Sequence, residues 1–377
     1  MRYTSVVWPA REDLTLSYAP WCKKRYPLSF RGLHEEMIDL YEWLRPSPLE
    51  IALRFRVFER VRCILQQIWP LARIDFFGSL YTGLFLPSSD IDVVVEVETN
   101  CENPLSRTAE VLRLSCIADS IQVLDKAFVP IVKLVDRDTK ISFDISFNTP
   151  SGVMAAGFIQ QMKRRYPCLE PLALILKQFL TQRQLNLVFT GGLSSYGLIL
   201  MLISFFQRTL NEVNLGEIFL SFLQLYSLDF NYMNTALRIR DGGAYIPKEQ
   251  MLAQMNRPSN SNLCIEDPLQ PENDVGRCSW NIVSVRQEFE QAFKKLCAVF
   301  MQPREYSSVW RSHYNGSLLS HILSIPPKYT RYRNWLRGRV ILDGQFSSPP
   351  SLSRSSSPDL LSPLNDDTSL IYTPVDF

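Results

Sequence analysis

The sequence predicts an α+β fold in two domains, one with a mixed sheet and flanking helices and one mostly helical, with a cleft between them. Three observations support this prediction. Short runs between residues 74 and 148 alternate apolar and polar residues with the period of a strand. From residue 151 onward, long apolar stretches follow helical spacing. A chain of 377 residues with 46% hydrophobic composition also has room for two cores.

Local patterns predict the individual elements. Leu33, Met37, Leu40 and Leu44 lie at helical intervals, and Pro46 ends that helix. Similar spacing predicts helices at residues 51–69, 106–116, 169–180, 197–206 and 285–301. Apolar, β-branched or alternating runs predict strands at residues 91–97, 120–124, 129–135 and 140–148. Residues 237–263 are polar and contain glycine, so we expect a surface excursion there.

Changes in composition divide the chain. Residues 1–28 are rich in proline and aromatic residues, which predicts an extended arm along a surface. Residues 29–50 are a helical segment that we assign to the helical domain, residues 51–150 form the sheet domain, and residues 151–340 complete the helical domain. Residues 345–377 are rich in serine and proline and carry too little apolar surface to pack, so we expect a disordered tail.

The composition excludes several classes of protein. The net charge is only +2, so any affinity for nucleic acid must come from local patches. The eight cysteines show no Cys-x-x-Cys spacing, and we expect neither a zinc site nor disulfides. No apolar run approaches the ~20 residues that cross a bilayer, and the start of the chain lacks the pattern of a secretory signal. We therefore expect an intracellular protein without a membrane span.

Two carboxylates, Asp90 and Asp92, form the first part of a candidate site. They open a run of β-branched residues, and side chains two apart on a strand point to one face. Neighbouring carboxylates repel each other unless a cation neutralises them, and their oxygens suit Mg²⁺ or Mn²⁺. Although most Asp-x-Asp motifs lie in loops or at solvated edges, the pair fits half of a metal site.

Gly78 and Ser79 form the second part. Glycine lets the backbone approach a ligand, and Ser79 is suited to capping the short helical segment that follows. Free amides at a helix start bind anions. A Gly-Ser pair alone usually marks a turn. With ten residues between Ser79 and Asp90, however, the combination predicts a triphosphate held beside a metal.

This stretch resembles the nucleotidyltransferases of the DNA polymerase beta superfamily. Its full form, Gly-Ser-x-x-x-Gly-Leu-x-Leu-Pro-x-Ser-Asp-Ile-Asp, is similar to the terminal RNA nucleotidyltransferases, most of all the TRAMP-type poly(A) RNA polymerases with a PAP-associated domain. The resemblance extends over about residues 28–300. It implies a nucleotidyltransferase domain beside a helical central domain, and template-independent addition of AMP from ATP to RNA 3′ ends.

Asp144 lies on the polar face of the alternating strand at residues 140–148. A lone Asp on such a face is usually solvated. The resemblance, however, implies a third carboxylate about fifty residues after the first pair. We therefore predict Asp90, Asp92 and Asp144 as catalytic residues and as the ligands of two Mg²⁺ or Mn²⁺ ions. The resemblance also implies that Asn148 contacts the ribose.

Lys177 lies within the apolar helix predicted at residues 169–180. It is either a surface lysine with a buried stem or a cation for the triphosphate. The segment Leu-Lys-Gln-Phe-Leu-x-x-Arg-x-Leu-Asn is similar to the family segment that supplies a phosphate-binding lysine. Some relatives carry a second lysine four residues later, where this chain has Thr181. Either Arg183 replaces that lysine or nothing does.

Ser195 and Tyr196 open the helix predicted at residues 197–206. From the pattern alone they are a helix cap and a core aromatic residue. The resemblance implies that Ser195 contacts phosphate and that Tyr196 stacks on the base, which holds any base. It also implies that residues 265–277 are the nucleotide-recognition loop in its adenylating form, Asp-Pro-Leu-x-x-x-Asn-Asp-Val-Gly-Arg. In that loop, Asn273 and Asp274 are the predicted contacts for adenine.

Residues 328–339 interleave cations with aromatic residues, which predicts either a surface that RNA follows or a solvated helix end. The resemblance implies an RNA 3′ end and ATP as substrates, and a zinc-knuckle RNA-binding protein and an RNA helicase as partners. It favours nuclear RNA processing or decay over a cytoplasmic role. Two alternatives stay open: a uridylyltransferase that uses UTP, and an inactive nucleotidyltransferase-fold scaffold that binds RNA.

Overall fold

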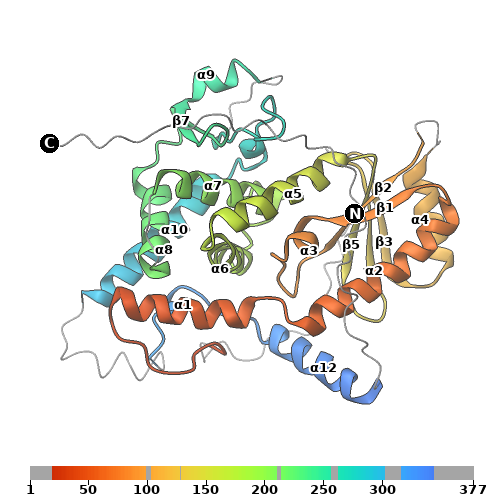
Figure 1. Ribbon diagram of the computed structural model, residues 1–377, viewed down its shortest axis with the longest axis horizontal. Helices are drawn as coiled ribbons and strands as arrows, with labels where there is room; N and C mark the ends of the chain where they lie inside the picture. Colours follow the sequence, from red (N-terminus) through yellow and green to blue (C-terminus); the bar gives the residue numbers. More distant parts are fainter. Residues whose placement is uncertain are drawn as a thin grey trace, which may run out of the picture.

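Two domains lie side by side in the computed structural model, a sheet domain and a helical domain (Figure 1). The structure describes residues 19–98, 103–127, 129–209, 214–255, 262–301 and 316–343, and all structural statements concern these residues. The predicted tail and most of the predicted N-terminal arm lie outside them. The arrangement confirms the predicted α+β fold, with a mixed sheet plus a mostly helical second domain.

The sheet has five strands in the order β1-β2-β5-β4-β3. Their bounds are Arg73–Phe77 for β1, Ile91–Glu96 for β2, Ala118–Leu124 for β3, Ile131–Asp136 for β4 and Ser142–Phe147 for β5. Strands β2 and β5 pair in parallel, and the other pairs are antiparallel. Apolar residues of the central strands, such as Val93, Phe143 and Ile145, are fully buried. Alternation therefore leaves the polar residues of these strands on the opposite face.

Three helices belong to the sheet domain: α2 (Pro48–Ile68), α3 (Gly78–Thr82) and α4 (Pro104–Leu114). Helix α2 starts at a capping box, in which Ser47 Oγ accepts from the Glu50 amide and Glu50 Oε2 accepts from the Ser47 amide at 2.8 Å. It packs on β1 and α4, and α4 packs on β3 and β4. The sheet domain therefore has its own hydrophobic core.

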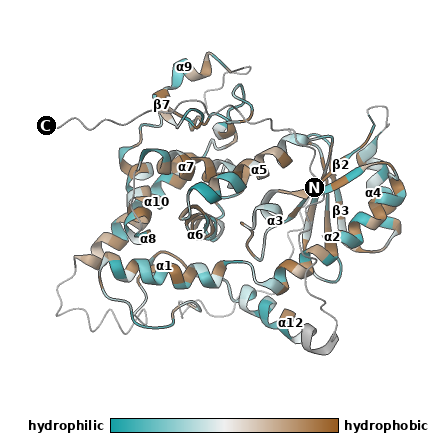
Figure 2. Ribbon diagram, in the orientation of Figure 1, coloured by the Kyte–Doolittle hydropathy of each residue, from teal (hydrophilic) through white to brown (hydrophobic). Residues whose placement is uncertain are grey.

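At the centre of the helical domain lie two apolar helices, α6 (Leu169–Thr181) and α7 (Ser195–Arg208) (Figure 2). Most residues of both helices are buried. Around them lie α1 (Phe30–Leu44), α5 (Pro150–Arg165), α8 (Leu215–Gln224) and α10 (Ile282–Phe300). Short turns of helix occur at Val188–Thr190, Leu225–Asp229, Val275–Cys278 and Leu319–His321. Helix α8 has no counterpart among the predicted helices.

A small hairpin lies within the region expected to be only a surface excursion. Strands β6 (Thr235–Arg238) and β7 (Ala244–Pro247) pair antiparallel, and α9 (Lys248–Leu252) follows. The turn between them has positive φ values of 56°, 83° and 82° at Asp241, Gly242 and Gly243. Such a turn reverses the chain, because glycine adopts this backbone conformation without strain. The expectation of a surface excursion at residues 237–263 named no strands, and the structure shows that its first half forms this hairpin.

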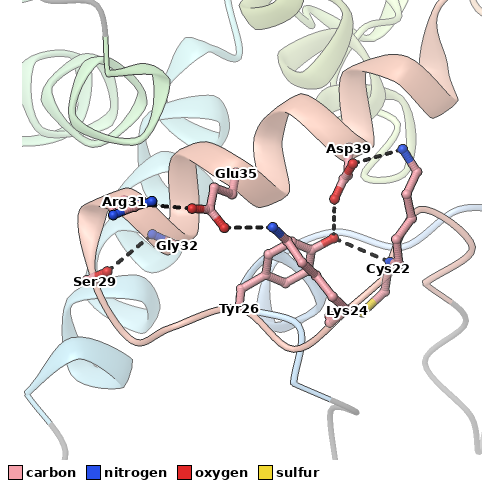
Figure 3. A network of polar contacts seen from close by, with 9 residues as sticks. Cys22, Lys24, Tyr26, Ser29, Arg31, Gly32, Glu35 and Asp39 are labelled. Carbon is pink, nitrogen blue, oxygen red and sulfur yellow. Dashed lines mark hydrogen bonds and ion pairs between the residues drawn. The ribbon is translucent and has the colours of Figure 1, made fainter.

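Residues 19–28 of the arm lie along α1. Lys24 Nζ contacts Glu35 Oε2 at 2.8 Å, and the Tyr26 hydroxyl donates to Asp39 Oδ2 at 2.8 Å (Figure 3). Deeper in the interface, Trp21 is fully buried and its Nε1 donates to Glu36 at 2.9 Å. This part of the arm is thus fixed to the helical domain by both polar and apolar contacts.

Helix α12 (Pro327–Asp343) contains the basic and aromatic residues for which we predicted either an RNA surface or a solvated helix end. Neither prediction describes its aromatic residues. Tyr329 is 2% exposed, and Leu336 is buried in the core of the sheet domain with Tyr332 and Trp335 packed against it. The aromatic residues therefore attach this helix to the body of the protein.

Within the described part of the chain, no helix is long and apolar enough to cross a membrane. No disulfide joins any of the cysteines there.

Candidate active site

A cavity of about 900 Å³ lies between the domains. Its wall in the sheet domain includes Gly78, Ser79, Asp90 and Asp92. The side chains on its other wall that the sequence predicted are Lys177, Ser195, Tyr196, Asn273 and Asp274. The fold thus brings residues that are almost two hundred positions apart in the sequence to one space.

Asp92 on β2 and Asp144 on β5 are register partners across the parallel strand pair. Their side chains therefore leave the sheet at the same level and on the same face. Asp90 lies two residues before Asp92, at the start of β2. The sheet places the third carboxylate beside the first two.

Lys133 of β4 also belongs to this cluster, although we did not select it from the sequence. It is the register partner of Asp144 on the other side of β5. Its Nζ lies 2.8 Å from Asp90 Oδ2 and 3.0 Å from Asp144 Oδ1. One ammonium group therefore bridges two carboxylates and offsets part of their negative charge. The available sequence signal was a lone cation in the middle of the alternating run Ile131–Asp136.

The carboxylates of the cluster are electrostatically strained. Burial and the charges of Asp144 and Asp90 raise the pKa of Asp92 to about 7. Burial also raises the pKa of Asp144, with Lys133 opposing the shift. On the other side of the cavity, burial lowers the pKa of Lys177 to about 8, with Asp92 opposing that shift. Both buried charges would be stabilised by a ligand of opposite sign.

The donor set fits a divalent cation by its chemistry. Three crowded carboxylates offer the oxygen ligands that Mg²⁺ and Mn²⁺ prefer. Burial, and after it repulsion by Asp144 and Asp90, raises the pKa of Asp92, and such a cation would oppose both effects. The side chains, however, are arranged around Lys133 and not around a shared ion. Among the described residues, no three His, Cys, Asp or Glu side chains are arranged to hold a metal ion. Lys133 lies between Asp90 and Asp144, so it must move for both to share an ion.

Gly78 is required by its position beside Asp92. Its φ is +62°, a backbone conformation that residues other than glycine rarely adopt. A Cβ atom there would also collide with the Asp92 carboxylate. The amide of Ser79 is hydrogen bonded to Asp92. Ser79 lies inside α3, whose start has no side-chain cap, so the capping role that we expected for it is wrong. Its hydroxyl remains on the cavity wall.

Lys177 lines the cavity and also donates a hydrogen bond to the protein backbone. Its side chain is almost fully buried, and Nζ donates to the carbonyl of Leu84 at 2.6 Å. Thr181, four residues later, also lines the cavity. Arg183 does not replace a second lysine. Its guanidinium contacts Glu288 at 2.6 Å and donates to the carbonyl of Ile322 at 2.8 Å.

The two serines at the start of α7, Ser194 and Ser195, have different roles. Ser194 is the cap, because its hydroxyl accepts from the Gly197 amide at 2.9 Å. Ser195 is the first helical residue and lines the cavity. The hydroxyl of Tyr196 donates to Asp267 Oδ1 at 3.1 Å, and burial raises the pKa of this tyrosine. Tyr196 is therefore held in one orientation on the cavity wall.

Asp267 accepts hydrogen bonds that connect the recognition loop, residues 265–277, to Tyr196 and to Asn273. We did not predict this role from the sequence. Asp267 Oδ2 accepts from Asn273 Nδ2 at 3.2 Å while Oδ1 accepts from Tyr196. Asp274 acts differently from its neighbour, since its Oδ1 accepts the amides of Ile265 at 3.0 Å and Gly276 at 2.8 Å. We predicted adenine contacts from Asn273 and Asp274 alike, but the Oδ1 of Asp274 is used to hold the loop together.

Asn148 lies outside the cavity. It follows β5 at the end opposite to Asp144, and its Oδ1 accepts from the Val97 amide at 2.9 Å. It is not among the residues that line the cavity. The predicted ribose contact is therefore not supported, because Asn148 joins the ends of two strands instead.

Comparison with known families matches two segments of the chain. The family described as poly(A) RNA polymerase, mitochondrial-like, central palm domain matches residues 33–164. The family described as Cid1 family poly A polymerase matches residues 214–273. The first segment contains the three carboxylates, and the second ends at Asn273.

Two relatives illustrate the range of similarity. The poly(A) RNA polymerase gld-4 of Caenorhabditis elegans is 46% identical over 373 residues, which are 93% of this chain and 44% of that protein. The Trf4-2 protein of Drosophila melanogaster, named as an inactive poly(A) RNA polymerase, is 36% identical over 316 residues, 81% of this chain and 76% of that protein. The chain thus spans less than half the length of the first relative.

Solved structures show the same fold. The polymerase core of TRAMP, an RNA surveillance complex, superposes with a TM-score of 0.70 at 30% identity and covers 82% of this chain and all of its own. The Cid1 poly(U) polymerase superposes with a TM-score of 0.64 at 23% identity, over 76% of this chain and 99% of its own.

Proposed function

This chain belongs to the family of Cid1-type and TRAMP-type poly(A) RNA polymerases, and from this membership we propose that it adds AMP from ATP to RNA 3′ ends without a template. The observation that carries the proposal is the cavity, which is lined by Asp90 and Asp92 of the sheet domain and by Lys177 and Tyr196 of the helical domain. One wall suits a cation and a reacting phosphate, and the other suits a triphosphate and a base.

In the proposed reaction, the RNA 3′-hydroxyl oxygen attacks the α-phosphorus of ATP, and pyrophosphate leaves. Divalent cations bound by Asp90, Asp92 and Asp144 would lower the pKa of that hydroxyl and neutralise charge on the triphosphate. The absence of a side chain at Gly78 lets the Asp92 carboxylate lie against the start of α3, where Gly78 and Ser79 face the cavity and would contact the phosphates. Lys177 and Ser195 face the same space and would orient the triphosphate.

The proposed preference for ATP rests on the pair Tyr196 and Asn273. Both are fixed by the carboxylate of Asp267, at 3.1 Å and 3.2 Å. Stacking on Tyr196 holds any base, so the choice must come from hydrogen bonds. The amide of Asn273 both donates and accepts, which suits the N6-amino group and N1 of adenine. We expect ATP to be preferred over UTP by roughly tenfold or more, as one or two such bonds allow.

One experiment tests this function. The purified 377-residue chain is incubated with a labelled oligoribonucleotide, Mg²⁺ or Mn²⁺, and each nucleoside triphosphate separately. Extension with ATP, and loss of extension in an Asp90→Ala, Asp92→Ala variant, is the expected result. Equal or better extension with UTP would identify a uridylyltransferase.

An inactive RNA-binding protein is the second candidate, because one relative in the family is named as inactive. The presence of all three carboxylates and of Gly78 in this chain favours activity. Failure to extend RNA with any nucleotide, by protein that still binds the oligoribonucleotide, would support the inactive candidate.

We also propose, from the family resemblance, that RNA selection depends on partner proteins and that the protein acts in the nucleus. Affinity purification of the tagged protein and fluorescence microscopy test these two proposals.

A further inference from the structure

The chain crosses between the two domains at residues 45–47, between the end of α1 and the start of α2, and again at residues 148–149, between β5 and α5. Helix α1 packs on α6 and α8 of the helical domain, whereas α2 packs on β1 and α4 of the sheet domain. A side chain that bonds to both ends of the first connection, residues 45–47, therefore restricts how the domains are oriented across the cavity.

Arg333 of α12 is such a side chain. Its guanidinium donates to the carbonyls of Trp43, of Leu44 at 3.3 Å and of Arg45 at 3.2 Å, which are the last carbonyls of α1. Its Nε also donates to Glu50 Oε1 at 3.1 Å, in the first turn of α2. Glu50 is 1% exposed and already belongs to the capping box of α2. One guanidinium, on a side chain that is 12% exposed, thus joins both sides of the connection.

Tyr329, one helical turn earlier on α12, contacts the segment that leads to the carboxylates. Its hydroxyl lies 2.6 Å from Ser88 Oγ, two residues before Asp90. From the other direction, Arg54 of α2 donates to the carbonyl of Pro87 at 3.2 Å. The chain immediately before Asp90 is therefore held by two different helices.

Helix α12 also enters both hydrophobic cores. Tyr329 is buried in the core of the helical domain, and Leu336 is buried in the core of the sheet domain. The helix lies close to α2 and outside both segments that match the known families (Figure 1).

We propose that Tyr329 and Arg333 are positioning residues: Tyr329 sets the place of Asp90 through Ser88, and Arg333 sets the angle between the domains through Glu50 and the end of α1. The proposal rests on the proposed function where it concerns nucleotide addition. Its physical basis is that each contact has one almost fully buried partner, Tyr329 in the first and Glu50 in the second, and that each joins elements of different domains.

A double-mutant cycle tests the first contact. Tyr329→Phe and Ser88→Ala each remove one hydroxyl, singly and together, in the full chain. We measure Mn²⁺ binding by the paramagnetic resonance signal of free Mn²⁺, and AMP addition in a single turnover. Each single variant should weaken both by about three- to tenfold, and the double variant should be no worse than the singles. Tyr26→Phe, which removes a matched hydroxyl bonded to Asp39, should change neither quantity.

Unchanged Mn²⁺ binding in Tyr329→Phe would overturn the role of this contact. Additive losses in the double variant would do the same, because they would show that the two hydroxyls act independently. A fall in melting temperature without a change in Mn²⁺ binding would assign Tyr329 a purely structural role.

Spin labels test the second contact without any catalysis. A noncanonical amino acid is introduced at Leu114 of α4 and at Gln287 of α10, both exposed positions, and each carries a spin label. The distance between the two labels reports the distance between the domains. Arg333→Ala and Glu50→Gln should each broaden the distribution of that distance, and Arg333→Lys should do so as well, because a lysine cannot reach all of these partners at once. Arg331→Ala, at an exposed position on the same helix, is the control.

An unchanged distribution in folded Arg333→Ala and Arg333→Lys protein would overturn the role of Arg333. If the wild-type chain adds no nucleotide, the proposed function fails, while the distance and Mn²⁺ measurements still decide this proposal.

Discussion

Asp92 and Asp144 lie side by side as register partners on the parallel strands β2 and β5, although 51 residues lie between them in the sequence. Asp90, which immediately precedes β2, and Lys133 of β4 lie next to this pair. The lysine offsets only part of the negative charge of the three carboxylates, and this imbalance leads to measurable consequences.

Removal of Asp144 should abolish nucleotide addition and leave the fold intact. Asp144→Ala deletes a carboxylate from the polar face of β5, where no hydrophobic packing is lost, and a loss of roughly a hundredfold or more in rate is expected for a charged group that acts on the reacting atoms. Nucleotide binding should largely survive, because Asp90 and Asp92 remain. Primer extension and ATP binding by calorimetry measure the two effects.

The control for Asp144 is Asp119→Ala, which removes an exposed carboxylate on β3 that pairs with Lys140. Such surface pairs contribute little, so this variant should behave as wild type. Near wild-type extension by folded Asp144→Ala protein would refute the assignment of Asp144 to the reaction.

Removal of Lys133 should destabilise the metal-free protein and should do so less when Mg²⁺ is present. Lys133→Met leaves Asp90 and Asp144 without their shared cation, and a half-buried pair of this kind stabilises by about 1–2 kcal/mol, between the values for exposed and buried pairs. A divalent cation replaces the lost charge. Urea unfolding in EDTA and in Mg²⁺ measures the difference.

Lys140→Met is the matched control, since it removes a lysine from a surface pair on the same sheet. If Lys133→Met loses the same stability with and without Mg²⁺, the lysine and the cation do not occupy overlapping places.

The stability of the metal-free protein should fall as the pH rises from about 4 to about 7. Burial, Asp144 and Asp90 raise the pKa of Asp92 from 3.8 to about 7, so the folded protein holds this proton more tightly than the unfolded chain does. The resulting stability is complete below pH ~4 and is lost as the pH passes through about 7. Denaturation in EDTA across this range measures the slope.

Asp92→Asn should flatten that slope, because the amide does not titrate. The lowered pKa of Lys177, about 8, acts in a different window: its stability contribution is present above the unfolded value of 10.5 and is lost as the pH falls through 8. A slope between pH 4 and 7 that is the same in Asp92→Asn and wild type would contradict the assignment to Asp92.

Changes in the recognition loop should separate base choice from loop integrity. Asn273→His should narrow the preference for ATP over UTP without stopping turnover, because it replaces the amide but leaves the loop bonds of Asp274 intact. Asp274→His should instead destabilise the loop, since it removes the acceptor for two backbone amides. Competition assays with both nucleotides, together with melting curves, distinguish these outcomes.

Asp267→Asn provides a further comparison, because it weakens the contacts that orient both Tyr196 and Asn273. We expect it to lower discrimination more than the maximal rate. A preference for ATP that neither Asn273→His nor Asp267→Asn alters would refute the role of this loop.

The sequence by itself determined the strands and the chemistry on them. Asp90 and Asp92 share a face because strand geometry alternates with a period of two, and the alternation around Asp144 has the same cause. The sequence also indicated a close approach of the backbone at Gly78, but only the structure shows that the Asp92 carboxylate is the group that lies against it. The apolar helices α6 and α7 followed from composition alone, since a helix that is hydrophobic on all sides must be buried.

The tertiary structure decided which polar groups meet. Lys133 reaches two aspartates only because β4 lies next to β5, and no local pattern encodes that neighbour. Asn148 follows β5, the strand that carries Asp144, and the hydrogen bond from the Val97 amide holds its side chain at the far end of that strand. The cations and aromatic residues of α12 suited RNA by composition, yet Arg333 and Tyr329 are buried against partners more than two hundred residues away. Contacts of that range depend on how the domains pack, which residue patterns along the chain do not specify.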